Sequence, residues 1–338
     1  MVRALWMLVA LIVLLSLGAE ASAQERWYRG NTHTHTTVSD GRAAPDVVVR
    51  WYQEHGYDFV VLTDHDYRTP IDGLNAVFGA PGKFLVVAGV EVTDRFPVTV
   101  EGGRTLALPV HLNGIHVREH VRPQRGENIV EIIQRNARAI REVGGVPQLN
   151  HPNFFWALTA EQILAASEVR HFELYNGHPL VNSRGGGGSP STEEIWDRVL
   201  SAGRVLYAMA TDDAHEYANF SAAEAIPGRA WIMVRAAELS AEAIAAAIDR
   251  GDFYATTGVR LRAYAASEKG IRIELMENPS LTAPRYRTYF TGKDGTVLKR
   301  DDSLQPAYEF RGDELYVRAR IESSDGSIAW TQPVFLKK

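Results

Sequence analysis

Strand-like runs alternate with amphipathic segments along most of the chain. Seven runs, most of them apolar and bounded by polar or glycine residues, predict strands at 26–32, 58–63, 84–90, 106–115, 145–149, 169–175 and 205–210. Apolar residues at helical spacing predict helices at 46–55, 128–143, 159–166, 192–202 and 239–250. Short apolar strands separated by helices are typical of parallel sheets covered on both faces. This rhythm predicts an α/β fold, a closed or nearly closed seven-stranded (β/α)7 barrel.

The pattern changes after Thr257-Gly258, where short strands follow one another without intervening helices. These strands are predicted at 260–265, 271–275, 286–291, 315–321 and 329–336. We therefore expect a barrel domain over 24–258 and a small β-rich C-terminal module over 259–338.

The first 23 residues have the composition of a secretory signal peptide. A positive start at Arg3 precedes an apolar run over 4–17, and Ala21-Ser22-Ala23 is a small-residue cleavage site. The alternative is a membrane anchor, but the run is shorter than the roughly 20 apolar residues that a spanning helix needs. With no second apolar run, the sequence predicts an exported protein, periplasmic or extracellular, without stable membrane insertion.

The composition limits the partners and the metal ligands that the protein can have. The hydrophobic fraction of 45% is sufficient for a sizeable core. A net charge of −5 and a pI near 6.1 argue against nucleic acid as a partner. The chain has no cysteine, so disulfides and thiolate ligands are excluded and any metal must be held by nitrogen and oxygen.

Histidines and carboxylates follow the predicted strands at the points where the strands end. In chain order these residues are His33, His35, Asp40, Asp64, His65, Glu91, His111, His151, Glu173, Asp212, Asp213 and His215. Because the carboxyl ends of barrel strands meet at one mouth, we expect these side chains to converge. Such a buried group of imidazoles and carboxylates needs cations to neutralise and order it, which predicts a metal centre.

These motifs, taken in order, resemble the PHP family, named for polymerase and histidinol phosphatase domains. The matching stretches are His33-x-His35, Asp40, Thr63-Asp64-His65, Gly89-x-Glu91, His111, Asn150-His151-Pro152 and Asp213-x-His215. The contexts of His111 and His151, the stretch 251–258 and the tail 329–335 look like the exported, carbaryl-hydrolase-like branch of that family. The resemblance covers roughly 27–338 and implies a distorted seven-stranded barrel with a centre of two or three divalent metals.

The resemblance also implies a ligand set. His33, His35, Glu91 and Asp213 would hold the first metal. Glu91 would bridge to a second metal held by His111 and His151, and Asp40, His65 and His215 would hold a third. Asp40 stands where many relatives carry a histidine. These ligands suit zinc, manganese or iron(II).

The same resemblance implies a metal-bridging hydroxide as nucleophile, held at the Glu91 and Asp213 centre, so that no protein nucleophile is required. Asp64 is expected to orient a ligand imidazole from outside the metal shell. Asp213 is preferred to Asp212 as the ligand because of the Asp-x-His spacing.

The substrate is expected to be a small-molecule ester, and three functions stay open. Family resemblance favours a phosphomono- or phosphodiester, while the carbaryl-hydrolase-like contexts imply a carboxylic or carbamic aryl ester. The third is a non-catalytic binding protein whose C-terminal module recognises carbohydrate or protein; the complete ligand set argues against it. Two sets of side chains bear on the choice. Candidates for substrate binding are Arg68, Arg184 and His178, and candidates for an apolar leaving-group pocket are Phe154, Phe155 and Trp156.

Overall fold

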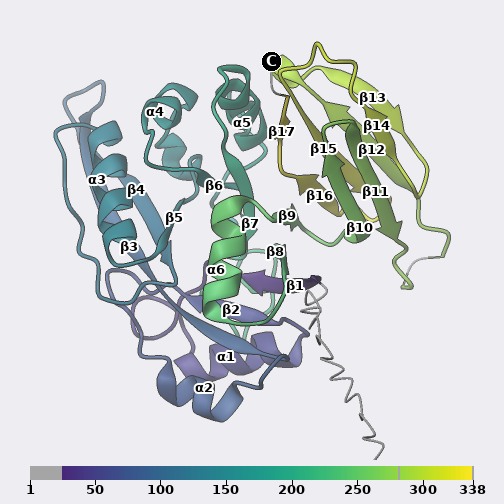
Figure 1. Cartoon of the computed structure of the whole chain (residues 1–338). Coiled ribbons are helices and arrows are strands. Elements are labelled where there is room, and N and C mark those ends of the chain that lie inside the picture. The colour runs from purple at the N-terminus through teal and green to yellow at the C-terminus, as the bar shows by residue number, and fades with distance from the viewer. Residues whose placement is uncertain (1–24, 281, 337–338) are drawn as a thin grey trace, which may run out of the picture.

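The computed structural model describes residues 25–280 and 282–336, and it shows a mixed α/β fold (Figure 1). One long sheet runs through most of it, in the order β13-β12-β15-β16-β9-β8-β1-β2-β3-β4-β5-β6-β7. The strands of its N-terminal part are β1 (Arg26–Asn31), β2 (Phe59–Leu62), β3 (Leu85–Thr99), β4 (Thr105–Ile115), β5 (Val146–Leu149), β6 (His171–Asn176) and β7 (Tyr207–Thr211). All seven overlap the predicted strands.

Five helices lie between these strands and a sixth follows them in the chain. They are α1 (Pro45–Glu54), α2 (Asp72–Phe78), α3 (Ile129–Glu142), α4 (Ala160–Ala165), α5 (Thr192–Ser201) and α6 (Ala241–Arg250). Side-chain caps fix several starts: Asn128 accepts from the N–H of Glu131, and Ser191 forms a capping box with Glu194. Only the short α2 was not predicted.

The predicted barrel is only partly realised. β1, β2 and β3 pair in parallel, as do β5, β6 and β7, but β4 is antiparallel to both of its neighbours. The reason is a long β3–β4 hairpin turning at Gly102 and Gly103, both with positive φ, in place of a crossover helix. No ladder joins β7 to β1; one parallel bridge, Thr34 with Ala214, connects the segments that follow them. The sheet curls without closing.

The C-terminal part continues the same sheet. β8 (Trp231–Ala236) pairs antiparallel with β1, and β9 (Phe253–Thr256) lies between β8 and β16 (Ile328–Thr331). The further strands are β10 (Arg260–Ser267), β11 (Gly270–Met276), β12 (Tyr286–Thr291), β13 (Val297–Asp301), β14 (Ala307–Glu309), β15 (Tyr316–Ser323) and β17 (Val334–Phe335). β10, β11 and β14 form a separate three-stranded sheet. The division into two domains near residue 258 stays a prediction.

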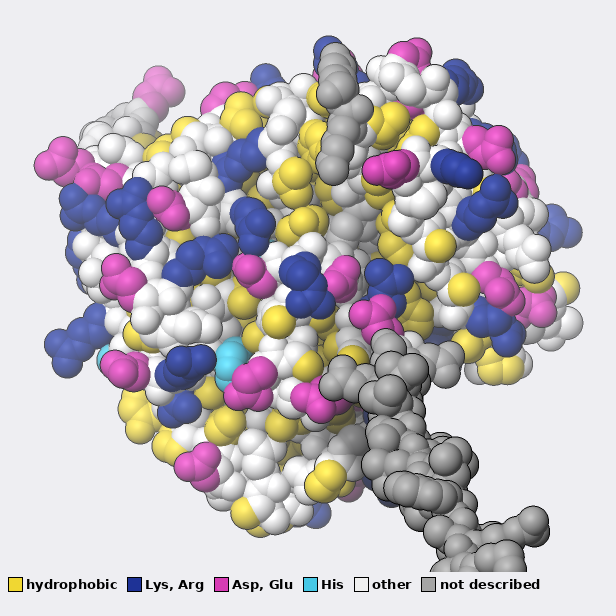
Figure 2. All heavy atoms as spheres, in the orientation of Figure 1, with side chains coloured by type: hydrophobic (Ala, Val, Ile, Leu, Met, Phe, Trp, Pro, Cys, Tyr) yellow, Lys and Arg dark blue, Asp and Glu magenta, His cyan; other side chains and the backbone are white. Residues whose placement is uncertain are grey.

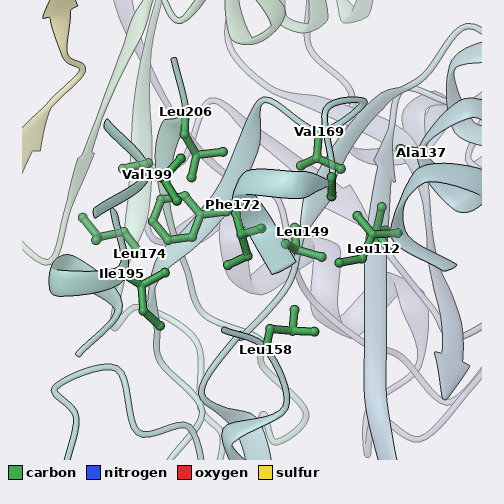
Figure 3. Packing of buried hydrophobic residues seen from close by; sticks show 14 of the residues in the cluster. Leu112, Ala137, Leu149, Leu158, Val169, Phe172, Leu174, Ile195, Val199 and Leu206 are labelled. Atoms are coloured by element: carbon green, nitrogen blue, oxygen red, sulfur yellow. The ribbon is translucent and has the colours of Figure 1, made fainter. Parts of the chain in front are cut away.

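The apolar core fills the space between the sheet and its helices. Leu112 of β4, Leu149 of β5 and Phe172 of β6 pack together with Val199 of α5 and Leu206 (Figure 3). Each of these side chains is fully buried. Burying a side chain of this size contributes about 1.5–3 kcal/mol, so this cluster holds β4, β5 and β6 together against α5.

A buried ion pair joins α5 to the C-terminal strands. The guanidinium of Arg318 on β15 donates to both carboxylate oxygens of Asp197, at 2.8 and 2.6 Å, and lies 2.9 Å from Glu193. Arg318 also lies over the ring of Trp196 at 4.7 Å. These contacts fix the C-terminal strands against α5.

The surface of the described residues mixes both signs of charge. On the face shown in Figure 2, Lys and Arg side chains alternate with Asp and Glu, without a broad patch of one sign. Within the described residues, no helix has the length and apolar character needed to cross a membrane. The predicted signal peptide, 1–23, lies outside the described residues, and export stays a prediction.

Candidate metal centre

The segment after β1 brings the first two histidines into the fold. Residues 32–36 run extended between β2 and β7: the N–H of Thr63 donates to Thr34 O, and the N–H of His35 donates to Ala214 O, both at 3.0 Å. In an extended segment alternate side chains share a side, so His33 and His35 point the same way. Their Nε2 atoms are 3.1 Å apart and both rings are fully buried.

Glu91 lies within β3 and is the centre of the cluster. Its Oε2 lies 3.5 Å from His33 Nε2 and 3.3 Å from His35 Nε2. Its Oε1 lies 3.1 Å from His111 Nδ1 and 3.3 Å from His151 Nε2. Oε2 also lies 3.0 Å from His65 Nδ1. The two oxygens of one carboxylate therefore face two different sets of imidazoles, which is the arrangement that a bridging ligand requires.

Asp213 completes the inner part of the cluster. Its Oδ1 lies 3.2 Å from Nε2 of both His33 and His35. Its φ of 49° is unusual for a residue other than glycine, and His151, with φ of 25°, is strained in the same way. Such strain is held only where the surroundings fix it, and it clusters at functional sites.

Asp40 joins a second group at the rim. Its carboxylate lies 3.4 Å from each of His35 Nδ1, His65 Nε2 and His215 Nε2. A tight loop returns Asp40 over His35: the N–H of Gly41 donates to Thr36 O, and a side chain at Gly41 would lie 2.5 Å from the backbone of His35. Only glycine fits this approach.

All nine predicted ligands thus come together. The side chains that could share an ion form four overlapping groups: His33, His35 and Glu91; His33, His151 and Asp213; His65, Glu91 and His111; and His35, Asp40, His65 and His215. This agrees with the predicted clustering, while the number of ions and the ligands of each stay predictions.

The orientation of three imidazoles shows which nitrogen is available to a metal. His33 Nδ1 donates to Glu173 Oε1 at 2.6 Å, and His215 Nδ1 donates to Asp213 O at 2.9 Å. His65 Nδ1 lies 2.6 Å from Thr93 Oγ1, which itself donates to a backbone carbonyl and so accepts from the ring. In His33 and His215 the Nδ1 atom is thus engaged outside the cluster and Nε2 faces it, as in metal-binding histidines held by outer partners. In His65 the Nδ1 atom also lies 3.0 Å from Glu91 Oε2.

The electrostatics fit a cation site. Burial alone would raise the pKa of Glu91, but the imidazoles of His65, His33 and His111 outweigh it and hold this pKa well below its usual range. The pKa of Asp213 is likewise held well below its usual range, chiefly by His33 against the effect of burial. Burial lowers the pKa of His35 to about 4. The carboxylates are therefore ionised ligands, and His35 is a neutral one.

A buried nitrogen atom without a hydrogen-bond partner also points to a metal site. Among the described residues, His111 Nε2 is buried and has no hydrogen-bond partner, although its Nδ1 faces Glu91. With the two Nε2 atoms of His33 and His35 only 3.1 Å apart, the residues present fit a group of divalent cations better than a closed hydrogen-bond network.

Two neighbouring aspartates have structural contacts. Asp64, predicted to orient a ligand imidazole, instead accepts from the N–H and hydroxyl of Thr36 and from the hydroxyls of Ser39 and Thr69. It holds the loop that carries Asp40. Asp212 accepts from Tyr52 OH and from the N–H groups of residues 228–230. Asp213, not Asp212, faces the cluster, as preferred from the spacing.

Glu173 and Asn150 were not assigned a role from the sequence. Glu173 holds His33 Nδ1 and also accepts from the N–H of His151 at 2.7 Å. Asn150 donates to Glu91 Oε1 at 2.9 Å. Both lie at strand ends beside predicted ligands, which is the one signal that the sequence carries for them.

Above the cluster lies a cavity of about 140 Å³. Besides seven of the proposed ligands it is lined by Phe154, His178 and Val181. Of the three candidate substrate-binding residues only His178 lines it. Arg68 donates to Val117 O at 3.0 Å, and Arg184 lines a neighbouring hollow of about 520 Å³.

The predicted aromatic wall is also only partly present. Phe154 lines the cavity and packs edge-on against His151, with ring centroids 5.3 Å apart. Phe155 and Trp156 belong to the same short 3-10 turn, Phe154–Trp156, but turn outward and are exposed by 66% and 38%.

No family profile matches the chain, and no curated protein matches it in sequence. Similar solved structures include a two-domain protein from Bacteroides vulgatus that contains a predicted PHP-like metal-dependent phosphoesterase. It shares 16% identity over 92% of this chain and 96% of that chain, with a TM-score of 0.49. A proposed metal-dependent phosphoesterase from Bifidobacterium adolescentis shares 14% identity over 57% of this chain and 89% of that chain, with a TM-score of 0.38.

An amidohydrolase from Chromobacterium violaceum, with bound sulfate and no metal, shares 17% identity over 55% of this chain and 87% of that chain, with a TM-score of 0.34. The Bacteroides vulgatus protein bears the name of the family that the strand-end motifs of this chain resemble. The carbaryl-hydrolase-like branch stays a prediction.

Proposed function

We propose that this protein is a metal-dependent hydrolase of small-molecule esters, with phosphoric esters as the first candidate. The observation that carries the proposal is the convergence of nine imidazoles and carboxylates on Glu91 and its surroundings. A buried group of this kind is expensive to maintain for stability alone, because the charged members lose hydration. Bound metal ions would offset this loss of hydration, and catalysis would be the function of the group.

His33, His35, Glu91 and Asp213 would hold one ion, His111 and His151 with Glu91 a second, and Asp40, His65 and His215 a third. Bound there, divalent ions would lower the pKa of a coordinated water and take up charge that develops on the substrate. The chain's own contribution is to orient the ligands through Glu173, Thr93 and the Asp213 carbonyl, and to exclude bulk water from the inner ligands.

Charge favours an anionic substrate. Three carboxylates, those of Asp40, Glu91 and Asp213, would neutralise only half of the charge of three divalent cations. The loaded centre stays cationic, and a cationic site stabilises the negative charge on a phosphoryl group. This supports a phosphoester even though no Lys or Arg of the described residues lines the cavity.

A second candidate, a carboxylic or carbamic aryl ester, is favoured by the other side of the cavity. Phe154 and Val181 provide apolar lining next to the cluster, where an aromatic leaving group would fit. Arg68 and Arg184 do not line this cavity, so the two arginines that favoured a phosphate substrate in the sequence are not placed to bind one there.

A hydrolysis screen tests the proposal. Purified protein beginning near Gln24 would be incubated with aryl phosphomonoesters, phosphodiesters, and aryl carboxyl and carbamate esters, each with manganese, zinc or iron(II). We expect turnover of phosphate esters that disappears in the double variant His33→Ala/His35→Ala. His120→Ala, at an exposed position, is the matched control. A folded, metal-loaded protein without turnover of any ester would contradict the proposal.

A further inference from the structure

One polar side chain in the wall of the cavity belongs to none of the ligand groups. Within the described residues, the non-ligand lining consists of Phe154, Val181 and His178, and only His178 can donate a hydrogen bond. It lies beside the cluster, with its ring centroid 5.5 Å from that of His215 and 6.1 Å from that of Phe154.

His178 is held in one orientation by its own turn. Its backbone N–H donates to Asn176 Oδ1 at 2.8 Å, while the amide of Asn176 donates to Asp213 and to Glu173. The turn after β6 is thereby tied to the same carboxylates that orient the metal ligands. These contacts fix the backbone at His178, and the hydrogen bond from the N–H of Leu180 to Nδ1 restrains the imidazole itself.

The contacts of the ring define its tautomer. His178 Nδ1 accepts a hydrogen bond from the N–H of Leu180 at 3.2 Å. A neutral imidazole that accepts at Nδ1 carries its proton at Nε2. Nε2–H is then a donor on a side chain that borders the cavity.

We propose that His178 is a catalytic residue that donates its Nε2–H to the leaving-group oxygen of the substrate. The oxygen of a water molecule forms the new bond to phosphorus or to the carbonyl carbon, and the bond to the leaving-group oxygen breaks. The electron pair goes to that oxygen, whose negative charge is stabilised by this hydrogen bond, and the proton released by the water reaches the leaving group through solvent. No proton leaves His178. The inference rests on the proposed function and adds the residue that selects and assists the leaving group.

Two isosteric variants separate catalysis from a structural role. In His178→Gln the side-chain amide can reproduce the donor at Nε2, whereas in His178→Asn the amide oxygen can reproduce only the acceptor at Nδ1 that holds Leu180. We expect kcat to fall roughly 100-fold in His178→Asn and by less than about tenfold in His178→Gln. Metal content should match wild type in both.

The substrate series gives a second readout. With aryl phosphates the loss in His178→Asn should be larger for unsubstituted phenol than for nitrophenol, because a poor leaving group carries more charge in need of stabilisation. The tautomer is measured independently in the metal-free wild type by long-range nitrogen–proton correlation spectra, in which His178 should carry its proton at Nε2.

The inference is overturned by a proton at Nδ1, by equal losses across the leaving groups, or by an Asn variant at least as active as the Gln variant. In each case an active wild type leaves the proposed function intact. A wild type that loads metal but hydrolyses no ester contradicts the proposed function itself.

Discussion

Replacing Glu173 by glutamine tests whether the partners outside the metal shell matter as the geometry indicates. The carboxylate accepts five hydrogen bonds, from His33 Nδ1, Gln148 Nε2, Thr211 Oγ1, Asn176 Nδ2 and the N–H of His151. Three reach Oε1 and two reach Oε2. Glutamine can keep an acceptor at one position only.

The least costly orientation keeps the glutamine oxygen at Oε1 and turns its NH2 toward the donors of His151 and Asn176. Each buried donor left without an acceptor costs about 1–3 kcal/mol of folding free energy. The loss of negative charge beside His33 Nδ1 makes that imidazole a weaker ligand, and changes of this kind lower metal affinity roughly 10- to 100-fold. That corresponds to about 1.4–2.7 kcal/mol of binding free energy.

The assay is competition for zinc against a chromogenic chelator, with folding checked by circular dichroism and thermal unfolding. Glu142→Gln is the matched control, because Glu142 is exposed at the end of α3. A folded Glu173→Gln protein that binds zinc with wild-type affinity would refute the assigned role of Glu173.

Three further changes test other parts of the structure. Asp197→Ala leaves the buried Arg318 without its bidentate partner and should lower the free energy of unfolding by about 3–5 kcal/mol in urea titrations; a loss below about 1 kcal/mol would contradict the importance of this contact. Burial lowers the pKa of His171 from 6.5 to about 4, so the folded protein resists its protonation and loses stability as pH falls from about 6.5 to about 4. Between pH 7 and pH 5 this group should cost wild type about 2 kcal/mol, a loss absent from His171→Asn; identical pH profiles of unfolding would disprove it. Removal of metal by a chelator should abolish turnover and lower Tm, and manganese or zinc should restore both; full activity of verified metal-free protein is the opposing result.

The fold could be predicted as far as local signals reach. Apolar runs and helical spacing located the first seven strands and five helices, because these elements bury one face or both. The β3–β4 hairpin departs from the parallel pairing that alternating strands and helices predict, and its one local signal is the Gly102-Gly103 turn. The strand Trp231–Ala236, a short apolar run, was overlooked.

The site could be predicted where residue type and position suffice. His33-x-His35, Glu91 and Asp213 stand at strand ends, and strand ends converge, so their meeting follows from topology. The direction in which each side chain points cannot be predicted from the topology. Arg68 turns to Val117, and Asp64 binds the Thr36 loop, because contacts distant in sequence compete for them. Glu173 also stands at a strand end, but its contact with His33 could not be predicted because the two residues are 140 positions apart in the sequence.

The central claim is that Glu91 joins a group of divalent metals held by His33, His35, Asp213 and their neighbours. Crystals grown with manganese, measured at wavelengths on both sides of its absorption edge, would locate the ions directly. The account predicts anomalous peaks within bonding distance of Glu91, at least one of them also bound by His33 and His35. Saturating manganese with no anomalous peak among these side chains would contradict it.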